Sequence, residues 1–216
     1  MANIRALEAV SEAVIHQLRS NMRPADFADE LDPLIDPELQ LDFRVFTSRD
    51  FASSPITNGV SLFLYRIFAN GTQRLPPGRI GPDGQRRQSR LPVEMHFLLT
   101  VWAGEASLQH ALAGWMMRVM EDSSLLPASV LTAVAPTVFR SDETLELSLA
   151  ELSTENLLRI YEVLMPNVYQ LSVPYVARVI HLESELPLRS GSGAEVQERV
   201  QRAARYSPRA LGEGAS

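Results

Sequence analysis

The chain of 216 residues has 45% hydrophobic and 21% charged side chains, close to the average for a folded globular domain. At this length one core buries about 70% of the unfolded surface, so stability needs neither a disulfide nor a structural metal. The net charge of −6 argues against a general nucleic-acid-binding protein, which relies on an excess of positive charge.

Two residue types are missing from the sequence, and their absence excludes several kinds of chemistry. There is no cysteine, which excludes a thiol nucleophile, a thiolate zinc site and a disulfide framework. All 20 basic residues are arginine, so a Schiff-base lysine and a P-loop lysine are both excluded.

The N-terminal segment 1–22 has the pattern of an amphipathic helix. Ile4, Leu7, Val14 and Leu18 recur at helical spacing, with charged residues between them. These charges exclude a signal peptide, and the sequence has no run of 18 apolar residues that would span a membrane. We expect the protein to fold and assemble in the cytoplasm, with no membrane partner.

Three segments in the first half of the chain have the pattern of strands. Residues 41–45 alternate apolar and charged side chains, which predicts one buried face. Residues 60–68 are apolar at almost every position, as in a strand covered on both faces. Residues 92–102 alternate again, and we expect them to pair with 60–68 as a hairpin.

The segment between those two strands, residues 69–91, is rich in proline and glycine, and we expect it to hold no regular structure. It carries five arginines against the single acid Asp83: Arg74, Arg79, Arg86, Arg87 and Arg90. Two interpretations stay open. Either the arginines bind an anion or an acidic partner surface, or they only keep a solvated loop soluble.

The second half of the chain predicts a helix over 106–120, a short helix between Pro127 and Pro136, a strand at 145–149, a helix from the N-cap Ser153 to Met165, and a strand over 169–182. Pro174 interrupts the last strand, which places that strand at a sheet edge or over a bulge. The order of elements predicts an α+β domain in which a mostly antiparallel sheet packs with about three helices.

The composition changes from Leu186 on, with Pro187, the linker Ser190-Gly191-Ser192-Gly193 and an end rich in Gly, Ser and Ala. Residues 194–206 can form a helix supported by the pairs Glu195–Arg199 and Glu198–Arg202, but Val196 and Val200 give it little apolar surface. We therefore expect a domain over residues 1–185 and a flexible arm over 186–216 that orders only on a partner.

The sequence contains few groups capable of catalysis. The four histidines, His16, His96, His110 and His181, form no close ligand pair, and neither a nucleophile elbow nor a glycine-rich phosphate loop is present. A hydrolase would have to use Glu94 with His96, two positions apart on one strand face. Such side chains also commonly occupy the wetter face of an antiparallel strand, and the same applies to His181 with Glu183.

A small-ligand pocket is the other alternative. It would be lined by Trp115 and the adaptable side chains of Met116, Met117 and Met120. Packing in the core explains these residues equally simply, and we favour it.

Several longer strings resemble one known family. They are Gly59–Leu75, Leu91–Gly104, His110–Leu131 and Leu145–Ser184, and with Val10-Ser11-Glu12 in the first helix they cover about residues 3–184 in consistent order. Together they resemble the cap, or tail-terminator, family of phage-tail-like extracellular contractile injection systems of the antifeeding-prophage and virulence-cassette type.

The resemblance implies a structural role without a catalytic site or a cofactor. It implies an α+β subunit that forms a six-fold ring on the baseplate-distal end of tube and sheath and stops their elongation, in a particle that is released or kept in the cell. A closed ring needs a heterologous interface, in which two different patches of one subunit meet. As interface residues we expect the five arginines, the Pro174 strand, and Val196, Arg199, Val200 and Arg202 of the arm.

Overall fold

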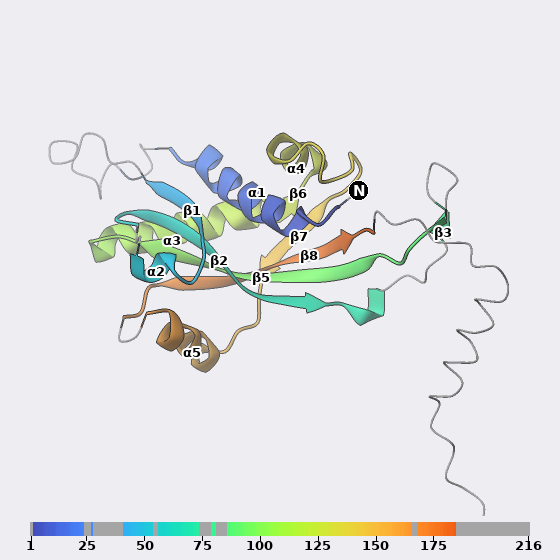
Figure 1. The fold of residues 1–216 in the computed structure, drawn as a ribbon. Coiled ribbons are helices and arrows are strands. Elements are labelled where there is room, and N and C mark those ends of the chain that lie inside the picture. The colour runs from blue at the N-terminus through green and yellow to red at the C-terminus, as the bar shows by residue number, and fades with distance from the viewer. Residues whose placement is uncertain are drawn as a thin grey trace, which may run out of the picture.

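The computed structural model describes residues 2–23, 27, 41–53, 56–73, 79–80, 86–165 and 168–184. Within them a curled six-stranded sheet lies between helices, in the strand order β1-β2-β5-β8-β7-β6 (Figure 1). Its strands are β1 (Asp42–Phe46), β2 (Gly59–Ala69), β5 (Leu91–Trp102), β6 (Leu125–Leu126), β7 (Leu145–Leu149) and β8 (Ser172–Leu182). The β1–β2 pair is parallel and the other pairs are antiparallel. The predicted α+β fold with a mostly antiparallel sheet is confirmed.

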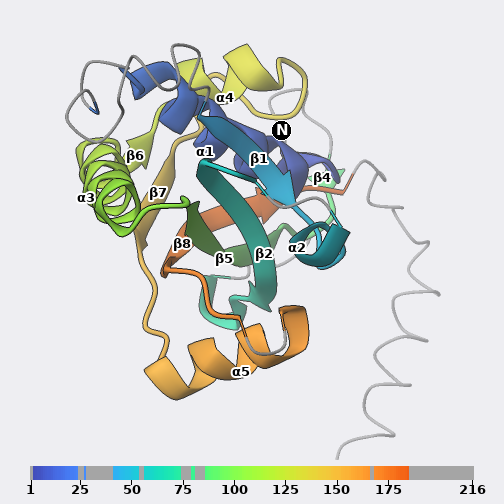
Figure 2. The same cartoon turned by 90° about the vertical axis from the view of Figure 1, so that its left-hand side faces the viewer.

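Three helices cover one face of the sheet: α1 (Ala6–Asn21), α3 (Ala106–Asp122) and α4 (Ala128–Val134) (Figure 2). Helix α1 buries Val10, Val14 and Leu18, and α3 buries Leu112 and Met116 against the same core. This spacing of three and four residues places the apolar side chains on one stripe of each helix. Only the start of the first stripe differs from the prediction, because Ile4 precedes α1 and is 89% exposed.

The opposite face carries a second, smaller core beneath α2 (Asp50–Ser53) and α5 (Thr154–Leu164). Phe51 of α2 packs its ring edge-on against Phe46 and Phe63, and Tyr161 of α5 completes the cluster. Helix α5 begins where the sequence predicts, because the Ser153 hydroxyl accepts a hydrogen bond from the Asn156 N–H. The sheet is thus packed on both faces over this part of its length.

Gly59 at the start of β2 allows β1 to pair closely with it. Its φ of +145° is a backbone conformation that side-chain-bearing residues rarely adopt. A Cβ placed there would lie 1.9 Å from the carbonyl oxygen of Asp42, the residue opposite it in β1. The parallel β1–β2 contact therefore requires glycine at this position.

Strand β8 corrects the interpretation of Pro174. It is an inner strand, paired with β5 on one side and β7 on the other, and the register shift in its pairing with β5 lies at Val93–Met95, away from the proline. The Pro174 carbonyl accepts from the Ala150 N–H, one residue beyond the end of β7. The nitrogen that lacks a proton therefore faces the last position of the β7 ladder, where it costs a single hydrogen bond.

Regular structure within residues 69–91 is the second correction. A short 3₁₀ helix, η2 (Gly71–Gln73), follows β2, and β3 (Arg79–Ile80) pairs antiparallel with β4 (Arg86–Arg87). The turn-forming residues Gly81, Pro82 and Gly84 lie between the two short strands in sequence, so the glycine and proline content that argued against regular structure also favours a hairpin.

Candidate functional site

The two ends of the sheet differ in how completely they are covered. We call the end of the sheet at which β2 and β8 finish and β5 begins the distal end of the sheet; the term refers to the subunit alone. There Ala69 lies opposite Val93, and Leu91 lies opposite Leu182. The arginine-bearing β3–β4 hairpin and the last described residue, Ser184, follow these strands at the same end (Figure 1).

Strand β2 has an unpaired edge at the distal end. Strand β1 pairs with Gly59–Phe63 only, whereas β2 continues to Ala69. Among the described residues no strand pairs with the outer side of Leu64–Ala69, which we call the open edge. The expectation that this strand is covered on both faces is correct for its first half and wrong for its second, where Ile67 is 50% and Phe68 is 45% exposed.

The main-chain groups of the open edge point outward at alternate residues. The Asn70 N–H donates to the Pro92 carbonyl of β5 at 2.9 Å, which sets the alternation. Phe68 and Arg66 then direct their N–H and C=O groups toward β5, and Ile67 and Ala69 direct theirs away from it. A register shift between Leu64 and Arg66 forms a bulge at the other end of the open edge.

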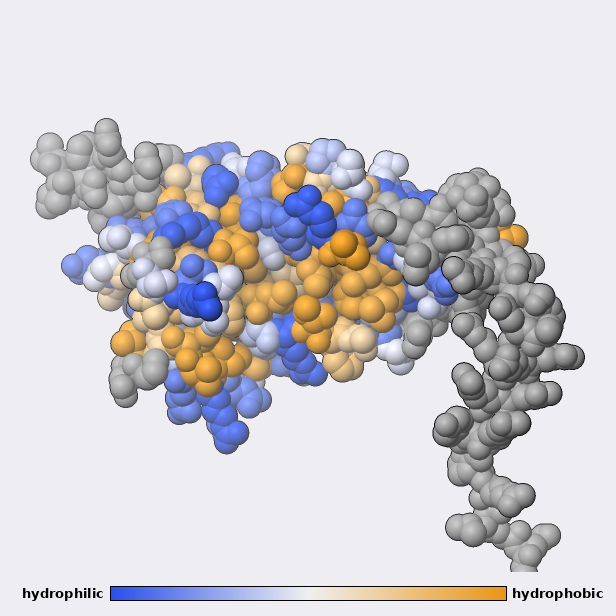
Figure 3. Space-filling view, in the orientation of Figure 1, coloured by the Kyte–Doolittle hydropathy of each residue, from blue (hydrophilic) through white to orange (hydrophobic). Residues whose placement is uncertain are grey.

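Apolar side chains surround the open edge. Figure 3 shows an area of hydrophobic surface in the middle of this face, over β2 and β5. Leu91 of β5 and Ile80 of the β3–β4 hairpin are exposed as well. The Arg66 guanidinium lies over the Phe68 ring, 5.3 Å from its centroid, and adds a positive charge beside the apolar surface.

The five arginines predicted to contact a partner are only partly described. Arg79, Arg86 and Arg87 belong to the β3–β4 hairpin, but their side chains lie outside the described part of the structure, as does Arg74 entirely. Arg90 forms an ion pair with Glu183 and its side chain is mostly buried. Arg90 therefore joins β5 to the end of β8 within the subunit.

The end of β8 is held at a defined position. The Glu183 N–H donates to the Ala2 carbonyl at 2.9 Å, and the Glu183 side chain pairs with Arg90. Residues beyond Ser184, including Val196, Arg199, Val200 and Arg202, lie outside the described structure. The C-terminal segment therefore leaves the domain from a fixed point at the distal end.

The Glu94 and His96 pair that a hydrolase would need lies on the sheet, also toward the distal end. His96 Nε2 is 3.8 Å from Glu94 Oε2, and the Asn70 side-chain amide donates to Glu94 Oε1 at 2.8 Å. Burial lowers the pKa of His96, Arg66 lowers it further, and Glu94 opposes the change. In the described part of the chain, no group of three or more acidic, histidine or cysteine side chains is placed to hold a metal ion.

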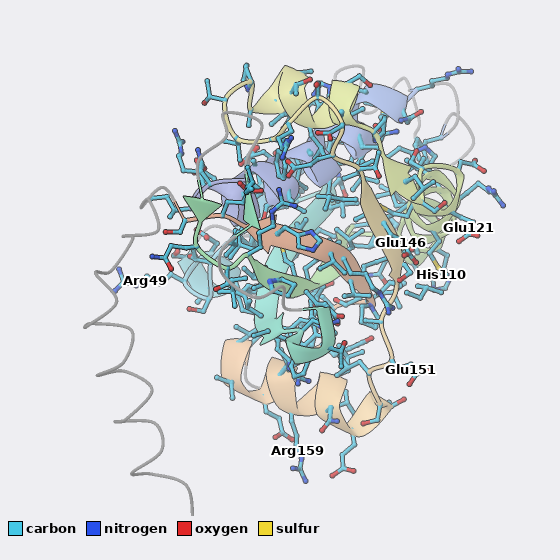
Figure 4. All side chains as sticks on the ribbon, turned by 90° about the vertical axis from the view of Figure 1, so that its right-hand side faces the viewer. Arg49, His110, Glu121, Glu146, Glu151 and Arg159 are labelled. Atoms are coloured by element: carbon cyan, nitrogen blue, oxygen red, sulfur yellow. The ribbon has the colours of Figure 1, made fainter. Side chains whose placement is uncertain are left out.

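Two other charged side chains, on the helices α5 and α3, lie apart from this pair. Arg159 points into solvent from the outer side of α5, and His110 lies on α3, away from α5 (Figure 4). Arg159 pairs with Glu155 on the exposed surface of its own helix. These side chains cover solvated helix faces.

Trp115, Met116 and Met120 of α3 are packed with the core. The Trp115 ring contacts Phe27 and Phe43 at centroid distances of 5.8 and 5.9 Å. Met116 and Met120 are fully buried, and Met117 points to the exposed side of the helix. Core packing therefore accounts for Trp115, Met116 and Met120, and it does not account for Met117.

A buried cluster of three hydroxyl groups fixes α5 to the sheet. The Tyr161 hydroxyl is 3.0 Å from Thr100 Oγ1 on β5 and 2.5 Å from Ser172 Oγ on β8, and Ser172 donates to Thr100 at 2.8 Å. Burial raises the pKa of the Tyr161 hydroxyl, which therefore stays protonated within the cluster. The cluster satisfies polar groups that would otherwise be buried without partners.

The sequence model of one protein family, described as the Pvc16 N-terminal domain, matches residues 9–193. The chain belongs to this family. A search of curated proteins finds no match. No helix of the described residues is long and apolar enough to cross a membrane.

Two solved structures share the fold of this family member. One is the PVC sheath/tube terminator of an extracellular contractile injection system in its extended state. The identity is 13%, the TM-score is 0.55, and the match covers 95% of this chain and 72% of that one. The other is the anti-feeding prophage cap, described as a tube terminating cap, with 14% identity, a TM-score of 0.54, and coverage of 91% and 69%.

Proposed function

We propose that this protein is a structural cap of a contractile injection system, which forms a ring on the baseplate-distal end of tube and sheath and stops their elongation. The observation that carries the proposal is the family match over residues 9–193. The fold supports it, because the two solved structures named as a sheath/tube terminator and a tube terminating cap align with more than nine-tenths of this chain.

A ring of six copies is the assembly that this function favours. A closed ring needs two different contact patches on each subunit. The subunit offers exposed surface at the distal end of its own sheet, where the open edge, Ile67 and Phe68 are exposed. The C-terminal segment follows β8 at the same end of the sheet. We infer that the particle is assembled in the cytoplasm and that the cap remains part of it.

Contact with tube and sheath is assigned to the arginine-bearing segment and the C-terminal arm. Guanidinium groups bind carboxylates through two parallel hydrogen bonds and tolerate partial burial, which suits an acidic rim. Because Arg90 pairs with Glu183, the residues available for such contact are Arg74, Arg79, Arg86 and Arg87. The arm over 186–216 would extend from the domain and contact a neighbouring copy or the sheath.

We propose no enzymatic activity, cofactor, nucleic-acid partner or membrane partner. The alternatives were a hydrolase using Glu94 and His96 and a ligand module around Trp115. Glu94 is engaged by Asn70, and the Trp115 ring is packed against Phe27 and Phe43. No observation on the described residues favours either alternative.

The decisive experiment deletes the gene in a producing strain and measures particles by electron microscopy. Without the cap we expect tubes and sheaths of variable, extended length, and reintroduction of the intact chain restores a uniform length. Native mass spectrometry of the purified protein then gives the number of subunits in the ring. Particles of normal length in the deletion strain would overturn the proposal.

Charge reversal tests the contact with tube and sheath. Replacing Arg79, Arg86 and Arg87 with Glu should abolish cosedimentation of the cap with tube and sheath while the melting temperature is unchanged. Arg159→Glu on the solvated face of α5 is the matched control and should bind normally. Normal capping by the triple variant would show that the hairpin is not the contact.

A further inference from the structure

We propose that the open edge of β2 accepts residues 185–188 of a neighbouring copy as an added strand. The inference rests on the proposed function in that it requires copies to associate, and it names the segment and the edge that join them. The edge offers the outward main-chain groups of Ile67, which a new strand would satisfy.

The chemistry of residues 185–188 fits an outermost strand. Leu186 and Leu188 are two apart, so their main-chain groups point to the same side, and Pro187 between them points to the other. When the main-chain groups of both leucines point toward β2, those of Pro187 point to solvent. At such an outermost position the missing N–H of Pro187 removes no hydrogen bond from the sheet.

The side chains determine one register. With Leu186 opposite Ile67 in an antiparallel pair, the exposed Ile67 side chain is covered on its own face of the sheet. Leu188 then reaches the bulge beside Leu64, so both leucines meet apolar partners. On the other face Glu185 lies opposite Phe68, within reach of the Arg66 guanidinium that covers the Phe68 ring.

The length of the open edge also matches. From Phe63 back to Gly59 the outer side of β2 is paired with β1, and Phe46 lies opposite Phe63. An added strand therefore has to leave the edge at Phe63. In this register the segment reaches that point just after Leu188. The sequence continues with Ser190-Gly191-Ser192-Gly193, which imposes little restraint on the direction in which the chain leaves.

The donor must be another copy, because the segment cannot reach the open edge of its own subunit. Met95 lies opposite Ile67, and Ala177 of β8 lies opposite Met95, so the added strand would stand three strand spacings from β8, or about 14 Å. Glu183 is held by Ala2 and Arg90. Three residues from Glu183 to Leu186 span at most about 10 Å.

The resulting contact joins two different parts of the subunit. The donor leaves from the end of β8 and the acceptor is the edge of β2, so each copy gives to one neighbour and receives from the other. Such a heterologous contact repeats around a ring and closes when its rotation permits. Strand exchange would thereby link the ring through main-chain hydrogen bonds.

Disulfide trapping tests the pairing, since the natural chain contains no cysteine and introduced thiols are the only ones present. Ile67→Cys and Leu186→Cys are prepared as separate full-length proteins, mixed and oxidised. Residues opposite each other in a hydrogen-bonded antiparallel pair are about 5.5 Å apart between Cα atoms, which a disulfide spans. We expect covalent dimers in the mixture and a ladder of copies from the double variant.

The control is Val163→Cys on α5, which is more exposed than Ile67 and should cross-link to Leu186→Cys only weakly. Equal cross-linking to both positions, or a bond within one chain of the double variant, would overturn the pairing. If the unmodified protein forms rings but the mixed cysteine variants form no cross-link, the strand exchange is refuted and the cap function still stands. A protein that is monomeric at every concentration would remove the ring as well.

A second variant tests the apolar contact without disturbing the domain. Leu186→Asp lies beyond the held residue Glu183, so we expect an unchanged melting temperature and at least about tenfold weaker self-association by analytical ultracentrifugation, equivalent to about 1.4 kcal/mol. Leu211→Asp is the matched control in the same tail and should associate normally. Equal association by the two variants would contradict the proposal.

Discussion

The two halves of β2 carry out different tasks within one continuous strand. Gly59–Phe63 is paired on both edges and lies between the two cores, whereas Leu64–Ala69 is paired only with β5 and exposes Ile67 and Phe68. The first half holds the domain together, and the second half is the part that we propose to contact a neighbouring copy. Stability and assembly are therefore separable along a single strand, and substitutions in the two halves should affect different measurements.

The largest expected contrast in stability is between Leu62→Ala and Ile67→Ala. Leu62 is fully buried, and truncation leaves a cavity in the core, which costs about 2–5 kcal/mol. Ile67 is half exposed, and its truncation should cost less than about 1 kcal/mol while weakening self-association. Urea unfolding gives the first quantity and ultracentrifugation the second. Similar losses of stability at the two positions would contradict the division of the strand.

Gly59→Ala tests the point at which the paired half begins. An alanine there would adopt an unfavourable backbone conformation and direct its Cβ into the main chain of Asp42, so we expect a loss of about 2 kcal/mol or more. Gly71→Ala is the control, because a Cβ at that position meets no atom within 4 Å. Thermal unfolding of the two variants compares them directly, and equal melting temperatures would refute the close β1–β2 contact.

Tyr161→Phe tests the hydroxyl cluster that fixes α5 over the paired half of the sheet. The variant keeps the ring and removes one buried hydroxyl, while Ser172 and Thr100 still bond to each other. We expect a loss of about 1 kcal/mol in unfolding free energy. Tyr169→Phe, at a half-exposed ring, should change stability by less than about 0.5 kcal/mol.

The smallest expected effect concerns the pH dependence contributed by His96, which lies in the distal half of β5. Because the folded protein lowers the pKa of His96, the unfolded chain binds the proton more tightly. Stability should therefore fall as the pH drops below the unfolded value of about 6.5 and should gain nothing further above it. His96→Gln should flatten this slope below about pH 6.5, as measured by thermal unfolding across a pH series.

The helices and the strand segments were predictable because their apolar spacing is set by local geometry. The stripe of α3 and the N-cap Ser153 of α5 need no knowledge of the rest of the chain. The pairing of residues 60–68 with 92–102 follows from two adjacent apolar segments joined by turn-forming residues. The helix features are decided within the segment itself, and the strand pairing by two segments and the residues between them.

The position of β8 could not be predicted in the same way. A proline in a strand favours an edge, and only the length of β7 shows that the missing N–H of Pro174 falls at the end of a ladder. Strand order is set by contacts between segments far apart in sequence. For the same reason nothing local indicated that β1 runs parallel to β2.

The open edge was missed although the sequence contains a sign of it. The predicted strand at 41–45 is about half as long as the one at 60–68, so any pairing between them leaves part of the longer strand unmatched. The apolar residues Ile67 and Phe68 were assigned to a strand covered on both faces, because composition does not distinguish a buried apolar side chain from an exposed one. The sequence Leu186-Pro187-Leu188 in the tail has the pattern of the outermost strand that we propose for this edge.

The central place of β8 has a consequence for synthesis. Strands β1, β2 and β5 on one side and β6 and β7 on the other are joined only when Ser172–Leu182 inserts between them. Until that segment leaves the ribosome the nascent sheet consists of two separate parts, because its last strand to be translated is an inner one. Folding of the domain is thus delayed until nearly all of the described chain exists, and a truncated product lacks the strand that unites it.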